Sequence, residues 1–220
     1  MDTTKAETRP RILVLGAGGH GKAVLDLLLA GGEWQPAGVV DAAPRVASVL
    51  GIPVLGDEAQ FAALRAAGVG AAHPAIGHNA HRIAAAARLA AAGFALPVLR
   101  HPACVIGHGA TLGEGTAIFA RAVIGPEARL GRLVLVNTGA IVEHDCIVED
   151  GAHVAPGAVL AGGVRIGAGA LVGAGAVIRP GVTIGAGSII GAGAAVLADV
   201  PAGVTVAGVP AQPLPERPPA

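Results

Sequence analysis

The chain has 220 residues, of which 53% are hydrophobic and only 2% aromatic, and its formal net charge is zero. This length allows one large or two modest domains with an aliphatic core, and two cysteines are too few for a disulfide scaffold. The balanced charge, with lysine only at Lys5 and Lys22, excludes a typical nucleic-acid-binding surface.

The first ten residues are polar and lack the apolar stretch of a signal peptide. No apolar run elsewhere reaches the roughly 18 residues that span a bilayer. We therefore expect a cytoplasmic protein with neither a membrane nor a nucleic acid as partner.

A strand, a glycine-rich turn, a helix and a second strand then follow in order. Arg11–Leu15 leads into Gly16-Ala-Gly-Gly-His-Gly21, an apolar helix covers about 22–30, and a strand at 37–40 ends at Asp41. This order matches the G-x-G-x-x-G mononucleotide unit, in which glycines let the backbone approach a phosphate at a helix N-terminus. The alternatives are a packing turn without a ligand and an Asp41 that simply ends its strand.

The remaining N-terminal segments continue the alternation of strands and helices. We predict a strand at 52–55, a helix at 57–67 capped by Asp57, a strand at 69–76 broken at His73-Pro74, and a helix at 80–92. Residues 1–100 thus form a Rossmann-like α/β domain with a parallel sheet. This is half of a complete dinucleotide-binding domain, so we expect a single nucleotide as ligand.

An aliphatic residue recurs at every sixth position through the C-terminal half. The series is Ile106, Leu112, Ile118, Ile124, Leu130, Val136, Val142, Val148, Val154, Leu160, Ile166, Val172, Ile178, Ile184, Ile190 and Val196. With glycine this dense, the unit is a short strand plus a corner, and three units make one triangular coil of 18 residues. We therefore predict an all-β parallel β-helix over 101–211, which stacks Val142 between Ile124 and Leu160, and a Pro-rich tail over 212–220.

The densest group of ionisable residues in this repeat is Glu143-His144-Asp145, at the corner that follows Val142. One coil above, the same corner position is Gly162, followed by Gly163. The imidazole would thus lie beneath bare backbone, whose N–H could stabilise an oxyanion, and Asp145 could raise its basicity. The alternative for His144 is a solvated corner residue.

The other histidines and Cys146 have simpler interpretations. His73, His78 and His81 straddle a strand end and a helix start without ligand geometry, and His108 lies two coils below His144. No metal site is expected. Cys146 occupies a small inward position and is expected to be a core thiol.

Several motifs carry a family resemblance along nearly the whole chain. They are Gly16-Ala-Gly-Gly-His-Gly-Lys22, Ala75-Ile-Gly77 with Asn79 and Arg82, His101-Pro-Ala103, Asn137 to Asp145, His153-Val-Ala-Pro-Gly157 and Ala207-Gly-Val-Pro-Ala211. The chain resembles the NeuD/PglD-type sugar acetyltransferases of the hexapeptide-repeat superfamily. The resemblance implies a left-handed β-helix, a homotrimer, acetyl-CoA between subunits as co-substrate, and a nucleotide-linked amino sugar on the N-terminal domain.

The resemblance also implies roles for single residues. His144 is implied as the general base and Asp145 as the residue that raises the basicity of its imidazole. The acetyl-CoA site would include His153, Gly162, Arg165 and Gly173, and the sugar-nucleotide site would include Gly18, Gly19, His20, Asp41, Gly77, Asn79, Arg82 and Asn137. Gln212 stands where the family usually has Lys or Arg, so Arg165 or Arg179 would have to replace that phosphate contact; a structural role is the alternative for His153.

The leading interpretation is an acetyl-CoA-dependent N-acetyltransferase for a UDP- or GDP-linked 4-amino-4,6-dideoxy sugar. A close alternative is O-acetylation of a sialic-acid hydroxyl. An NAD-dependent oxidoreductase would need a second mononucleotide-binding half, but the six-residue repeat occupies that part of the chain. A trimeric scaffold without catalysis is the remaining alternative.

Overall fold

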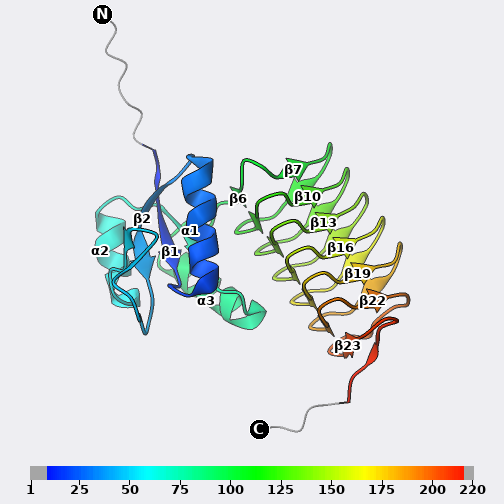
Figure 1. Cartoon of the computed structure of the whole chain (residues 1–220). Helices are drawn as coiled ribbons and strands as arrows, with labels where there is room; N and C mark the ends of the chain where they lie inside the picture. Colours follow the sequence, from blue (N-terminus) through cyan, green and yellow to red (C-terminus); the bar gives the residue numbers. More distant parts are fainter. Residues whose placement is uncertain (1–8, 216–220) are drawn as a thin grey trace, which may run out of the picture.

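The computed structural model describes residues 9–215, which form a small α/β domain and a long three-sided β-helix lying beside it (Figure 1). Both parts of the predicted fold class are therefore present. The expectations for residues 1–8 and 216–220 lie outside the described residues. Within residues 9–215, no helix is both long and apolar enough to cross a membrane.

The α/β domain is built on three parallel strands in the order β2-β1-β5. The strands are β1 (Arg11–Leu15), β2 (Gln35–Val40) and β5 (Ala71–Pro74), and a small antiparallel pair is formed by β3 (Ser48–Val49) and β4 (Ile52–Pro53). The helices are α1 (Gly19–Gly31), the short η1 (Glu58–Gln60), α2 (Phe61–Ala66) and α3 (Asn79–Ala91). The parallel sheet and the Asp57 cap are confirmed, since the Asp57 carboxylate accepts the Ala59 N–H at 2.9 Å.

The expected break at His73-Pro74 is wrong. Both residues belong to β5, and Pro74 is its last residue, in register with Leu15 of β1. Because β5 is an edge strand, the missing N–H of Pro74 costs no ladder hydrogen bond there.

The sixteen predicted aliphatic positions are the second residues of sixteen two-residue strands, β7 to β22. The first sheet contains β7 (Val105–Ile106), β10 (Val123–Ile124), β13 (Ile141–Val142), β16 (Val159–Leu160), β19 (Val177–Ile178) and β22 (Ala195–Val196). The second sheet contains β8 (Thr111–Leu112), β11 (Arg129–Leu130), β14 (Ile147–Val148), β17 (Arg165–Ile166) and β20 (Thr183–Ile184).

The third sheet begins in the linker and ends at the C-terminal end of the β-helix. It contains β6 (Leu99–Arg100), β9 (Ala117–Ile118), β12 (Leu135–Val136), β15 (His153–Val154), β18 (Leu171–Val172), β21 (Ile189–Ile190), β23 (Thr205–Ala207) and β24 (Gln212–Pro213). Strand β24 runs antiparallel to β23. The Pro-rich segment expected as a tail from residue 212 thus starts as an ordered strand.

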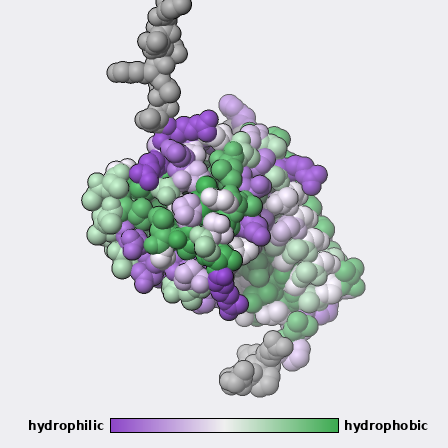
Figure 2. All heavy atoms as spheres, turned by 60° about the vertical axis from the view of Figure 1, so that its left-hand side comes forward, coloured by the Kyte–Doolittle hydropathy of each residue, from purple (hydrophilic) through white to green (hydrophobic). Residues whose placement is uncertain are grey.

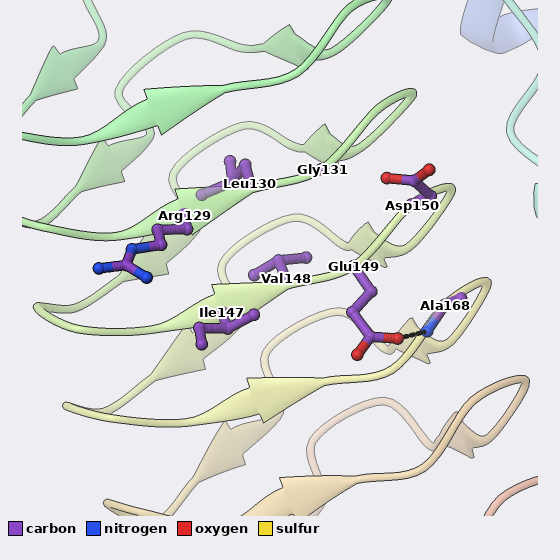
Figure 3. Close-up of a pocket in the computed structure, with 8 residues that line it drawn as sticks. All are labelled: Arg129, Leu130, Gly131, Ile147, Val148, Glu149, Asp150 and Ala168. Atoms are coloured by element: carbon purple, nitrogen blue, oxygen red, sulfur yellow. Dashed lines mark hydrogen bonds between the residues drawn. The ribbon is translucent and has the colours of Figure 1, made fainter.

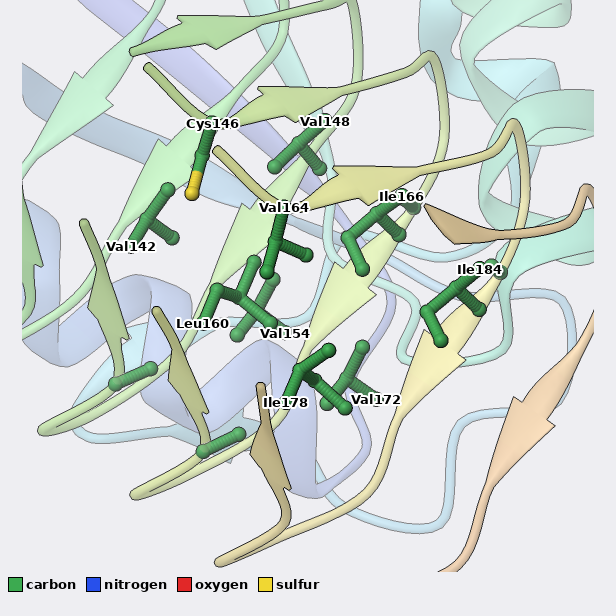
Figure 4. Packing of buried hydrophobic residues seen from close by; sticks show 14 of the residues in the cluster. Val142, Cys146, Val148, Val154, Leu160, Val164, Ile166, Val172, Ile178 and Ile184 are labelled. Atoms are coloured by element: carbon green, nitrogen blue, oxygen red, sulfur yellow. The ribbon is translucent and has the colours of Figure 1, made fainter. Parts of the chain in front are cut away.

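The core of the β-helix is a stack of aliphatic side chains from the three sheets (Figure 4). Val142 pairs with Ile124 on one side and with Leu160 on the other, which confirms the 18-residue stacking. Cys146 is fully buried among these side chains and its thiol donates to the Ala161 carbonyl at 3.2 Å, as expected for a core thiol. Strict stacking means that residues 18 apart lie at the same corner.

The α/β domain packs on the third sheet. Leu25 and Leu28 of α1 lie in one buried cluster with Ala117 and Leu135, the outward residues of β9 and β12. On the exposed face of the α/β domain, hydrophilic residues are interspersed with apolar ones (Figure 2). The buried contact brings the glycine turn before α1 close to the β-helix.

Candidate active site

His144 and Asp145 lie at the edge where the chain turns from β13 into β14. The Nδ1 atom of His144 is 2.8 Å from Oδ2 of Asp145, and the His144 side chain is 58% exposed. This hydrogen bond raises the pKa of His144. Since the carboxylate accepts a hydrogen bond from the Nδ1–H group, Nε2 is left as the basic nitrogen.

Asp145 adopts a left-handed backbone conformation, with φ of 58°, at a corner position that glycine fills in most coils. Asp tolerates this conformation better than most residues. The turn directs its carboxylate back to the neighbouring imidazole, so the local backbone and the side-chain pair are consistent with each other.

Gly162 covers the His144 ring, as the 18-residue register predicts. A Cβ atom added at Gly162 would lie 2.5 Å from both Cε1 and Nε2 of His144. The Gly163 N–H donates to the His144 carbonyl at 2.9 Å, whereas the Gly162 N–H has no partner among residues 9–215. A main-chain donor is therefore available beside the basic nitrogen.

The glycine turn divides into tight and open positions. A Cβ at Gly16 or Gly21 would collide with the main chain of Ala75 or Gly16, so these two glycines are required by packing. Gly18 and Gly19, by contrast, have open space around them. They lie at the N-terminus of α1, which no side chain caps, so N–H groups are available there for an anion.

Asp41 is connected directly to this turn. Its carboxylate accepts the Ala17 N–H at 2.7 Å and the Ala43 N–H at 2.9 Å. It therefore holds the turn in place, and its ribose role stays a prediction.

A cluster of four side chains joins the glycine turn to the third sheet. The His20 ring lies 5.5 Å from the Phe119 ring and 6.4 Å from the His153 ring, measured between centroids. Asn137 Nδ2 lies 3.2 Å from His153 Nε2. We call His20, Phe119, Asn137 and His153 the interdomain cluster.

The hydrogen bonds of Asn137 fix the tautomer of His153. Asn137 Oδ1 accepts the Thr138 N–H at 2.8 Å, so the NH2 group faces His153. Nε2 of His153 must then accept, and its proton is on Nδ1. Burial lowers the pKa of His153 to about 4 and that of His20 to about 4, so both rings are neutral at pH 7.

Two predicted sugar-site residues, Asn79 and Arg82, connect α3 to the β-helix. Arg82 is fully buried and makes no ion pair with any carboxylate in residues 9–215. Its guanidinium donates to Leu133 O at 3.1 Å, Ile76 O and Gly77 O at 3.2 Å, Asn79 Oδ1 at 2.9 Å and Gly151 O at 2.7 Å. Asn79 donates to Gly169 O at 2.8 Å.

These bonds use every donor group of Arg82. One of its acceptors, Gly77, lies next to His20: a Cβ atom added at Gly77 would be 3.9 Å from Cβ of His20. The structure thus brings Gly77 to the interdomain cluster and assigns Asn79 and Arg82 to the domain junction. Direct contact of these two residues with the sugar stays a prediction.

The predicted acetyl-CoA residues are spread over the β-helix. Arg165 is exposed on the second sheet next to Ile147. Gly173 is required by coil stacking, since a Cβ there would lie 2.5 Å from Ile190 O. Arg179 lies at the same edge as His144, two coils along, and donates to Leu197 O at 3.5 Å.

A groove of about 490 Å³ lies on the second sheet, between Arg129 and the acidic pair Glu149 and Asp150. Figure 3 shows the Glu149 carboxylate bonded to Ala168 of the next coil. None of the residues lining this groove is a predicted site residue. The groove is therefore separate from the His144 edge, although both involve β14.

His144 and the interdomain cluster lie on opposite sides of the β-helix. His144 is at the edge between the first and second sheets, whereas His153 projects from the third sheet, which lies across from that edge in a three-sided coil. One chain therefore holds two halves of a candidate site, which it does not bring together. Among residues 9–215, no three His, Cys, Asp or Glu side chains form a metal-binding group.

Phe119 and His73 are the residues near this site that sequence reasoning did not assign to it. Phe119 is one of only three phenylalanines, and it stands at a corner of the repeat beside Ala120. His73 stands alone as a polar residue in an apolar strand, β5. In both cases a residue type that is unusual for its surroundings was visible in the sequence and could have indicated the site.

Comparison with known families gives two matches. The PglD N-terminal domain matches residues 11–89, and the bacterial transferase hexapeptide (six repeats) matches residues 163–198. A comparison with curated protein sequences gave no match.

Solved structures match over nearly the whole chain. The perosamine N-acetyltransferase from Caulobacter crescentus, as a variant with one histidine replaced by asparagine and in complex with CoA and GDP-perosamine, is 40% identical, with a TM-score of 0.91 over 95% of this chain and 99% of that one. The acetyltransferase domain of PglB from Neisseria gonorrhoeae FA1090, in complex with acetyl coenzyme A, is 39% identical, with a TM-score of 0.87 over 94% and 100%. WeeI from Acinetobacter baumannii AYE is 29% identical, with a TM-score of 0.79 over 94% and 100%.

A Rossmann-like domain joined to a left-handed β-helix with an edge histidine defines an acyltransferase of the hexapeptide-repeat superfamily. Within that class, the chain belongs to the NeuD/PglD-type sugar acetyltransferases. The resemblance stated from sequence motifs is thereby confirmed.

Proposed function

We propose that the protein transfers an acetyl group from acetyl-CoA to the amino group of a nucleotide-linked 4-amino-4,6-dideoxy sugar. The observation that carries the proposal is the His144–Asp145 pair beneath the free N–H of Gly162. The 40% identity to an enzyme solved with CoA and GDP-perosamine supports both substrates. The proposed reaction takes place in the cytoplasm, since it draws on acetyl-CoA.

The chemistry follows from the two edge groups. Acetyl-CoA supplies the acetyl group as a thioester. Nε2 of His144 takes a proton from the acceptor nitrogen as that nitrogen attacks the thioester carbonyl carbon, and the Gly162 N–H donates to the carbonyl oxygen as negative charge develops. The carbon–sulfur bond then breaks, and protonated His144 returns the proton to the departing thiolate.

The glycine turn supports an anionic acceptor. Open space at Gly18 and Gly19 and the uncapped N-terminus of α1 favour a diphosphate. The neutral ring of His20, together with Asn137, offers hydrogen bonds to the sugar. The acceptor would thus extend from the glycine turn towards the third sheet.

We further propose that a homotrimer completes the site. The first sheet carries an aliphatic residue at the outward position of each of its first five strands, namely Val105, Val123, Ile141, Val159 and Val177. Val105 is 58% and Val177 48% exposed, which is typical of a surface that packs against another copy. Association through this sheet would bring the His144 edge of one copy to the interdomain cluster of the next.

A thiol-release assay tests the proposal. Acetyl-CoA is combined with GDP-perosamine, a UDP-linked 4-amino-4,6-dideoxy sugar, or free sialic acid, and the product is identified by mass spectrometry. Amide formation on one of the nucleotide sugars is expected. Transfer to sialic acid alone would replace the acceptor, and acetyl-CoA binding without transfer to any of them would overturn the proposal.

A further inference from the structure

His73 is a fully buried imidazole that the proposed chemistry does not use. It lies on β5 in register with Val14 of β1, and neither of its ring nitrogens has a hydrogen-bond partner among residues 9–215. Burial lowers the pKa of His73 to about 3, so the ring is neutral at pH 7. A neutral imidazole has one donor and one acceptor, and leaving either without a partner in a buried site is destabilising.

His73 lies under the glycine turn. Two residues further on, Ala75 donates its N–H to Leu15 O at 2.8 Å, and a Cβ at Gly16 would be 2.8 Å from Ala75 O. Ala71 and Ala75, two residues before and after His73, belong to the buried cluster that includes Val24 and Leu25 of α1, so this face of β5 packs on α1. The carboxyl end of β5 and the first turn of α1 therefore hold the two imidazoles near each other.

His20 has a matching unpaired atom. Its Nε2 is buried and makes no hydrogen bond within residues 9–215, while its ring faces Phe119 and His153. Arg82 does not satisfy either histidine, because its donors are engaged by main-chain carbonyls and Asn79. Three unpaired nitrogens from two rings thus lie in one buried region behind the interdomain cluster.

We propose that His73 is a positioning residue, which shares with His20 an internal polar site for one water molecule and thereby fixes the orientation and tautomer of His20. One water molecule can donate to a nitrogen of one ring and accept from a nitrogen of the other, and so link two neutral imidazoles. The inference rests on the proposed function only in placing His20 at the nucleotide-sugar pocket. It gives His73 a reason to be histidine in a strand whose other residues are apolar.

The first test is kinetic. Replacing His73 by phenylalanine fills the space and removes both ring nitrogens, so the melting temperature should not fall. The KM for the nucleotide sugar should rise about tenfold, which corresponds to one lost hydrogen bond, with the KM for acetyl-CoA unchanged. His73→Gln keeps a donor and an acceptor and should recover most of the loss.

The second test needs no substrate. In protein labelled with nitrogen-15 at histidine, the ring signals of His20 should report one neutral tautomer in the wild type and a mixture in His73→Phe. His81→Phe, a change at an exposed position on α3, is the control and should leave them unchanged. Unchanged His20 signals in His73→Phe would overturn the inference, whether or not the wild type acetylates a sugar, and so would an unchanged KM in an active enzyme.

Discussion

Nδ1 of His144 lies 2.8 Å from Oδ2 of Asp145 at an exposed edge of the β-helix. Because the carboxylate stabilises the protonated ring, it raises the pKa of His144. His144 works as a base only when unprotonated, so kcat/KM should fall as the pH drops through this raised pKa.

Asp145→Asn removes the carboxylate that raises this pKa. The acid limb of kcat/KM should therefore move to lower pH, and the maximal rate should fall because the base is weaker and its ring is less well held. Pairwise pH profiles of the wild type and the variant measure both effects. An acid limb at the same pH in both proteins would show that His144 does not control it.

Gly162→Ala should displace the His144 ring, since the new methyl group would lie 2.5 Å from Nε2. We expect a loss in kcat of about 100-fold, as for a misplaced catalytic group. Alanine occupies the same position of the six-residue repeat, at the other corners, at Ala168, Ala174, Ala186 and Ala192, so the backbone accepts it. Ala192→Gly is the matched control; equal activity of Gly162→Ala and wild type would remove Gly162 from the site.

Arg82→Ala should loosen the junction between the domains. It leaves Leu133 O and Gly151 O without their buried donor, at a cost of about 3 kcal/mol or more. Arg88→Ala on the same helix removes only an exposed ion pair with Glu58 and should cost less than about 1 kcal/mol. Thermal melting compares the two variants, and equal melting temperatures would contradict the role assigned to Arg82.

Mixing two inactive variants tests the site between subunits. His144→Ala lacks the edge base and His20→Ala lacks a member of the interdomain cluster, so each should be inactive or weak alone. Randomly mixed trimers should regain about a quarter of wild-type activity, because one interface in four joins two intact halves. No recovery in co-expressed, co-purified trimers would mean that each chain supplies its own complete site.

The β-helix was predictable because its register is strict. One aliphatic residue in six sets every strand, and counting 18 residues from His144 leads to Gly162 without any knowledge of the fold's surroundings. The glycine turn was predictable for a similar reason, since strand, turn and helix are neighbours in the sequence. Local periodicity and adjacency carry this information.

The contacts between the domains were beyond sequence reasoning. Arg82 bonds to Leu133 and Gly151, which lie 51 and 69 residues away, and His20 meets His153 across the same junction. Such contacts depend on how the folded surfaces of the α/β domain and the β-helix pack together, and the six-residue repeat does not specify that packing. The family resemblance implies Asn79 and Arg82 at the sugar, which stays a prediction, but it does not reveal their hydrogen bonds at the junction.

The most direct test of the central claim compares thiol release from acetyl-CoA, with the nucleotide sugar that the wild type acetylates, in three proteins: the wild type, His144→Ala and His108→Ala. His108 is an exposed histidine at the same edge, two coils away from His144. We predict that turnover by His144→Ala is about 10² to 10⁴-fold lower than that of the wild type, with an unchanged melting temperature. His108→Ala should keep the wild-type turnover. Normal turnover in His144→Ala would contradict the account.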